Sequence, residues 1–158
     1  MSEPLRPAPL VLALGNDILG DDAVGLLAAR RLAATLPTGV EVVEAPSGGL
    51  ALLELLEGRE RALILDAILT GRYPAGTVLE FSAADLEKVA APSPHFAGLP
   101  EILRLVDVLA IPFPRDLRVL AMEVADPYEV RERLTPLVER ALPSLVKRAR
   151  EVVGGWGA

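Results

Sequence analysis

Three ionisable residues lie where a predicted strand or loop gives way to a helix or turn. Asp22 follows the apolar run 9–14 and opens the next predicted helix, and Asp66 ends the apolar run 61–66. His95, the only histidine, lies in a proline-rich loop ahead of another predicted helix. Two carboxylates and one imidazole form a suitable three-ligand set for a borderline divalent cation. Such a set leaves coordination positions open for water or for ligands supplied by a substrate.

Each of these residues also has a purely structural interpretation. The dipole and the unpaired amide groups of a helix N-terminus favour an acid such as Asp22. Asp66 can cap the turn that follows its strand, and His95 can serve as a hydrogen-bonded loop histidine. Taken one at a time, the residues leave both interpretations open.

Several other chemistries are excluded or disfavoured. The chain has no cysteine, which excludes disulfides, thiolate metal sites and a cysteine nucleophile. The glycines of 15–25 look like a phosphate loop, but no Lys-Ser/Thr follows them and the adjacent Asp21 and Asp22 would repel a phosphate. The formal net charge of −6 disfavours nucleic-acid binding.

Apolar strands alternate with amphipathic helices along the chain, which predicts an α/β fold with a mostly parallel sheet covered on both faces. The strand over 77–81 alternates more and is expected at an edge. Because functional sites in such sheets form beyond the carboxyl ends of the strands, Asp22 and Asp66 should meet there, within reach of the His95 loop. The expected strands are 9–14, 40–44, 61–66, 77–81 and 116–122, and the expected helices are 23–36, 50–56, 99–110 and 134–153.

The length of 158 residues fits a single domain, 1–158, with an N-terminal arm over 1–8 and a loose tail over 154–158. No apolar run is long enough for a membrane span, and the N-terminus lacks a signal-peptide pattern. We therefore expect a cytoplasmic protein with no membrane or nucleic-acid partner. A monomer is expected, because a large partner has to dock over the site.

The run 15–25, Gly-Asn-x-x-x-Gly-Asp-Asp-x-x-Gly, resembles the N-terminal signature of the hydrogenase maturation proteases. The run 65–68 resembles their second motif, and Ser93-Pro94-His95 with the following Gly98-Leu99 resembles their third. The resemblance extends from about residue 10 to residue 153, with the motifs in order. It implies a three-layer α/β/α sandwich around a mostly parallel five-stranded sheet. It also implies an endopeptidase that removes a short C-terminal extension from the large subunit of nickel–iron hydrogenase after nickel insertion.

By position, Asp22, Asp66 and His95 match the family's three metal-contacting residues, and they form the predicted catalytic set. The resemblance makes nickel a cargo of the substrate, the hydrogenase large-subunit precursor, although other divalent metals can occupy such a site. The ion can polarise the scissile carbonyl and lower the pKa of a bound water. A carboxylate such as Asp22 or Asp66 can take the proton of that water, and the sequence does not assign the base.

Two loops depart from the family pattern and leave the particular substrate open. Family members often carry a Gly-Gly-Thr-like turn where this chain has 45–49, and a polar residue where it has Phe96. One alternative hypothesis is a non-catalytic nickel or divalent-metal binding module, similar to a metallochaperone, on the same fold. Another is a small-molecule binding α/β domain in which the acids are only helix caps.

Overall fold

The computed structural model describes residues 7–46, 50–86 and 99–157. Within these stretches, five strands form one sheet in the order β2-β1-β3-β5-β4. All neighbouring pairs are parallel except β4 and β5, which are antiparallel. This confirms a mostly parallel sheet with the strand near 77–81 at an edge. The strands are β1 Leu10–Leu14, β2 Glu41–Ala45, β3 Arg61–Ile68, β4 Val78–Ser82 and β5 Asp116–Glu123.

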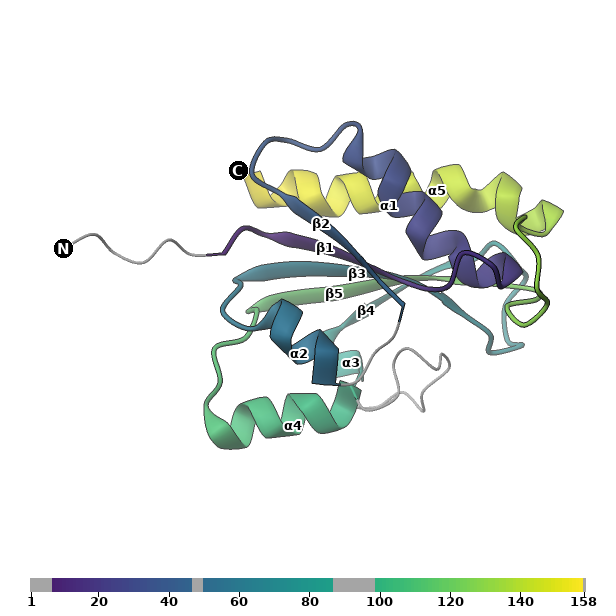
Figure 1. Ribbon diagram of the computed structural model, residues 1–158. Helices are drawn as coiled ribbons and strands as arrows, with labels where there is room; N and C mark the ends of the chain where they lie inside the picture. The colour runs from purple at the N-terminus through teal and green to yellow at the C-terminus, as the bar shows by residue number, and fades with distance from the viewer. Residues whose placement is uncertain (1–6, 47–49, 87–98, 158) are drawn as a thin grey trace.

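Helices cover both faces of the sheet, as Figure 1 shows. The helices α1 (Val24–Ala33) and α5 (Pro136–Gly154) lie on one face, and α2 (Leu50–Leu56) and α4 (Leu99–Leu109) lie on the other. Short helical segments complete the described chain: η1 Gly20–Ala23, α3 Ala83–Leu86 and η3 Gly155–Gly157. The predicted three-layer α/β/α sandwich is therefore confirmed.

The central strands supply both halves of the core. Side chains alternate across a strand, so Val11 and Leu63 pack with α1 and α5, whereas Leu12 and Ile64 pack with α2 and α4. All five residues of β1 are buried. Burial on both faces explains why these strands are continuous apolar runs in the sequence.

The end of β3 differs from the prediction that Asp66 is the last residue of its strand. The strand continues to Ile68, because Asp66 pairs with Ala121 of β5 and the pairing extends to Ile68 and Glu123. On the other side, the pairing of β3 with β1 reaches only as far as Leu65. Asp66 thus lies within the pairing of β3 with β5 but one residue beyond the pairing of β3 with β1.

The C-terminal segment, for which a loose tail over 154–158 is predicted, is described as far as residue 157. Gly154 ends α5, the 3-10 turn Gly155–Gly157 follows, and Trp156 packs against the core. The Arg61 guanidinium donates a hydrogen bond to the carbonyl of Trp156 at 2.5 Å. Partial burial of the indole ring and a charge-assisted hydrogen bond hold this turn against the rest of the domain. Of the predicted N-terminal arm, residues 1–6 lie outside the described part of the chain.

Within the described ranges, every helix is too short or too polar to span a lipid bilayer.

Candidate active site

The sheet has a switch point between β1 and β3. From β1 the chain passes through α1 to β2 on one side, and it later returns to place β3 on the other side of β1. At such a point the connections leave in opposite directions and open a crevice at the carboxyl ends of the two strands. Asp22 lies in η1, directly after β1, and Asp66 lies near the end of β3. The fold therefore brings both predicted acids to the same edge of the sheet.

Two glycines hold the Asp22 segment against the strand ends. A Cβ on Gly15 would lie 2.3 Å from the backbone oxygen of Asp22. A Cβ on Gly25 would lie 2.6 Å from the oxygen of Leu65 and 3.1 Å from the Cα of Asp66. Both contacts are too close for any side chain, so these positions require glycine. Gly15 and Gly25 thus allow the segment around Asp22 to lie directly against the ends of β1 and β3.

The two acids are shielded from solvent. Asp22 is 6% exposed and Asp66 is fully buried. The Asp66 carboxylate accepts a hydrogen bond from the N–H of Ala67 at 2.7 Å, and η1 contacts β3. A buried carboxylate costs free energy unless other groups compensate its charge. Buried carboxylates are therefore often found at functional sites.

His95, the third residue of the predicted set, lies outside the described residues. Among the residues that the structure does describe, no group of three or more His, Asp or Glu side chains is arranged to hold a metal ion. The three-residue metal-contact set therefore stays a prediction, with Asp22 and Asp66 at the sheet edge as its described part.

The sequence analysis missed the role of Asp21. This side chain is fully buried, and its carboxylate accepts hydrogen bonds from the N–H groups of Ala125 and Asp126, both at 3.0 Å. It also accepts one from the N–H of Thr135 at 2.7 Å and one from the Thr135 hydroxyl at 2.8 Å. Asp21 thus joins η1 to the segment between β5 and α5. No local signal separates it from Asp22, since its partners lie more than a hundred residues away.

Glu123 is a second buried acid that the sequence analysis did not single out. Its carboxylate accepts hydrogen bonds from the N–H of Thr70 at 2.8 Å, from the Thr70 hydroxyl, and from the N–H of Gly71 at 3.4 Å. It thereby holds the loop that follows β3. Among the described residues, the buried charged side chains are all acids near the carboxyl ends of strands: Asp21, Asp22, Asp66 and Glu123. Two of them hold loops, and the other two are the acids of the predicted site.

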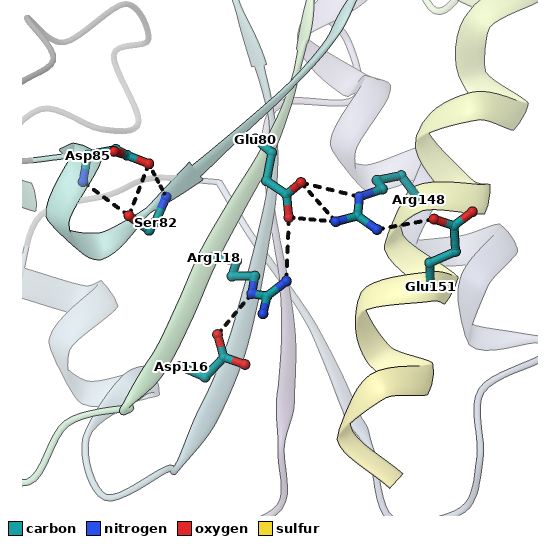
Figure 2. Close-up of polar contacts among 7 residues, drawn as sticks. All are labelled: Glu80, Ser82, Asp85, Asp116, Arg118, Arg148 and Glu151. Carbon is teal, nitrogen blue, oxygen red and sulfur yellow. Dashed lines mark hydrogen bonds and ion pairs between the residues drawn. The ribbon is translucent and has the colours of Figure 1, made fainter. Parts of the chain in front are cut away.

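A different charged cluster joins β4, β5 and α5 (Figure 2). Glu80 accepts hydrogen bonds from Arg148, the shortest at 2.9 Å, and lies 3.6 Å from Arg118. Arg148 also pairs with Glu151, and Arg118 with Asp116. The hydrogen bond that Arg148 donates to Glu80 is the main cause of the raised pKa of Arg148. A hollow of about 420 Å³ adjoins this cluster, but both arginines are already neutralised by acids, which favours a structural role.

Comparisons with known proteins agree with this architecture. A sequence model of the hydrogenase maturation protease family matches residues 26–152. The hydrogenase 2 maturation protease of Escherichia coli K12 is 29% identical over 153 residues, covering 90% of each chain. HupD, a hydrogenase expression/formation protein of Rhizobium leguminosarum, is 27% identical and spans 98% of this chain and 80% of its own.

Solved structures give the same result. The hydrogenase maturating endopeptidase HybD from E. coli superposes with a TM-score of 0.84 at 26% identity, covering 95% of this chain and 94% of its own. The NiFe hydrogenase maturation protease HybD from Thermococcus kodakarensis gives 0.74 at 29% identity, with 92% and 99% covered. With most of its length matched in sequence and in fold, this chain belongs to the hydrogenase maturation protease family.

Proposed function

We propose that this chain is the endopeptidase that removes a short C-terminal extension from the nickel-loaded large subunit of nickel–iron hydrogenase, acting as a monomer in the cytoplasm. Membership of the hydrogenase maturation protease family supports a peptidase. The observation that supports the proposal is the contact between η1, which carries Asp22, and β3, which carries Asp66, at the switch point of the sheet.

The proposed chemistry divides recognition from hydrolysis. Nickel arrives with the precursor, and Asp22, Asp66 and His95 offer it two carboxylates and an imidazole. A loaded precursor gains these ligand bonds and an empty precursor does not. Selectivity is then a difference between two affinities for one partner.

In the hydrolytic step, the oxygen of a water molecule adds to the scissile carbonyl carbon, the C–N bond breaks, and the departing amine takes a proton. Nickel on the substrate can polarise the carbonyl. A buried carboxylate beside it can accept the proton of the water, and either Asp22 or Asp66 fits that role. A site largely closed to solvent strengthens both effects, since charges interact more strongly away from water.

The deciding experiment compares nickel-loaded and nickel-free large-subunit precursor. Each is incubated with the chain, and the products are weighed by mass spectrometry. We expect loss of a C-terminal peptide from the loaded precursor alone. Absence of any mass change in the loaded precursor would overturn the proposal, and nickel binding by calorimetry without cleavage would indicate a non-catalytic metal-binding module.

Variants of the three residues test the site itself. Asp22→Asn, Asp66→Asn and His95→Ala should each abolish processing while the circular dichroism spectrum stays that of the parent chain. Asp17→Asn is the matched control. Asp17 is an exposed acid between β1 and η1, and it pairs with Arg30. If all three site variants trimmed the loaded precursor at the rate of the control, the site assignment would be wrong.

A further inference from the structure

Large apolar side chains are exposed around the carboxyl edge of the sheet. They belong to segments that follow β1, β3 and β5, and Figure 1 shows these segments at one end of the molecule. Tyr128 and Val130 are the most exposed of them, at 71% and 74%. We call the set the apolar rim: Ile18, Leu69, Tyr73, Tyr128, Val130 and Leu137.

The loop that carries Tyr128 and Val130 is held by hydrogen bonds. The Asp126 carboxylate accepts the N–H groups of Tyr128 and Glu129, both at 3.0 Å. At its base, the loop is bonded to the carboxylate of Asp21, as described above. The two exposed side chains therefore project from a backbone whose conformation is already set.

The same loop is joined to the segment after β1. Leu19 and Arg131 form a parallel β-bridge. The N–H of Arg131 donates to the oxygen of Ile18, and the N–H of Gly20 donates to the oxygen of Arg131, both at 2.9 Å. Ile18 and Val130 thus belong to two segments of the chain that lie side by side.

The loop after β3 is held in a similar way. The buried carboxylate of Glu123 binds Thr70 and Gly71, and the N–H of Gly76 donates to the backbone oxygen of Glu123 at 2.7 Å. A Cβ on Gly76 would lie 3.3 Å from the backbone oxygen of Leu137, so this loop packs against the start of α5. Leu69 and Tyr73 thus belong to a loop that packs against the helix start carrying Leu137.

Asp21 thus holds the loop after β5, and Glu123 holds the loop after β3. Both loops nevertheless expose large apolar side chains to water. Exposed apolar groups gathered at one place on a soluble protein mark interaction surfaces. Loops ordered before binding lose less conformational entropy when a partner arrives, which raises affinity. Among the described residues, the remaining exposed large apolar side chains, Leu105, Val108 and Leu109, all lie on α4.

We propose that the apolar rim is the docking surface for the folded body of the substrate protein, through an apolar patch around the point where its C-terminal extension leaves. This inference rests on the proposed function. Because the extension is short, the folded body has to lie against the edge that holds Asp22 and Asp66. Rim segments follow both β1 and β3, and Asp22 and Asp66 lie at the ends of the same two strands, so a body seated on the rim brings its tail to these acids. A second copy seated there would block the approach of the substrate tail to these acids.

The test uses a rim variant, Tyr128→Ser with Val130→Ser, and a matched control, Val108→Ser with Leu109→Ser. The control residues are exposed apolar side chains near the end of α4, which leads to the start of β5, at the opposite edge of the sheet. Affinity is measured with the nickel-free precursor, which isolates docking of the protein body from metal recognition and cleavage. We expect the rim variant to weaken binding about tenfold or more, and the control variant to change it less than about twofold.

Kinetics with the nickel-loaded precursor give the second readout. The rim variant should raise KM by a similar factor with little change in kcat, because no reacting group has been altered. Equal affinity of the rim and control variants would overturn the docking surface, while cleavage by the parent chain would still uphold the proposed function. Conversely, a parent chain that binds through the rim but cleaves nothing would uphold docking and overturn the peptidase. A dimer of the parent chain that dissociates in the rim variant would assign the rim to self-association instead.

Discussion

The carboxylate of Asp21 is hydrogen-bonded to both the backbone N–H and the hydroxyl of Thr135, which lies 114 residues further along the chain. The next residue, Asp22, lies in the same short helix at the candidate site. Two adjacent acids therefore have different tasks. One orders the loop that precedes α5, and the other belongs to the proposed chemistry.

Asp21→Asn should destabilise the fold. The amide side chain keeps one oxygen acceptor and places its NH₂ group toward the N–H groups that the carboxylate now accepts. Leaving buried donors unsatisfied should lower the free energy of unfolding by about 1–3 kcal/mol. Chemical denaturation followed by circular dichroism measures the change.

Asp22→Asn is the matched comparison for that variant. It should lower the free energy of unfolding by less than Asp21→Asn does, because the Asp21 carboxylate accepts bonds from Ala125, Asp126 and Thr135 and so anchors a distant segment of the chain. Processing of the nickel-loaded precursor should nevertheless be lost. Equal destabilisation by the two substitutions would contradict the division of roles between the neighbouring acids.

Gly25→Ala should loosen the contact between α1 and β3. The added methyl would lie 2.6 Å from the backbone oxygen of Leu65 and 2.9 Å from its carbonyl carbon, so the helix start has to move. Overpacking of this kind costs about 1–3 kcal/mol. The displacement should also reduce processing, since Asp22 lies one turn before Gly25.

Gly154→Ala provides the control for that substitution. A Cβ at Gly154 meets nothing within 4 Å, and the residue ends α5. Alanine there should leave the free energy of unfolding unchanged or raise it slightly, because alanine favours the helix. Thermal unfolding of both variants makes the comparison, and a Gly25→Ala chain as stable as Gly154→Ala would show that the close contact is absent.

The loop that carries Tyr128 should respond to acid below the ordinary titration range of aspartate. Hydrogen bonds first from the N–H of Tyr128 and then from that of Glu129 hold the pKa of Asp126 below its ordinary value of 3.8. A depressed pKa in the folded state means that the carboxylate stabilises the loop above the ordinary value and that this contribution is lost as pH falls through the lowered one. The NMR shifts of the two amide protons should titrate together with a midpoint below pH 3.8, and a midpoint at or above that value would contradict the hydrogen-bonded loop.

Glu80→Gln should weaken the attachment of β4 to α5 only modestly. Glu80 lies between Arg118 and Arg148, but all three side chains are partly exposed. Exposed ion pairs contribute about 0.2–1 kcal/mol, and salt screens them. The loss in unfolding free energy should shrink at high salt. Glu54→Gln, at an exposed position on α2, is the control and should show no such salt dependence.

The sequence by itself determined the layered α/β fold. Fully buried strands such as β1, and helices such as α2 at Leu50–Leu56, carry their periodicity in their own residues, so local patterns suffice to predict them. The motif at 15–25 indicated the family that the comparisons then showed. The grouping of Asp22 and Asp66 also followed from the sequence, because the carboxyl ends of parallel strands share one edge.

Only the tertiary structure decided what depends on distant partners. Pairing with β5 carries β3 past Asp66 to Ile68, and Trp156 packs, partly buried, against the core. Likewise, Asp21 and Asp22 look alike in sequence, and only the position of Thr135 makes Asp21 a structural acid. The physical reason is the same in each case. Local periodicity reports which face of an element is buried, whereas the groups that satisfy a buried carboxylate or extend a strand come from elsewhere in the chain.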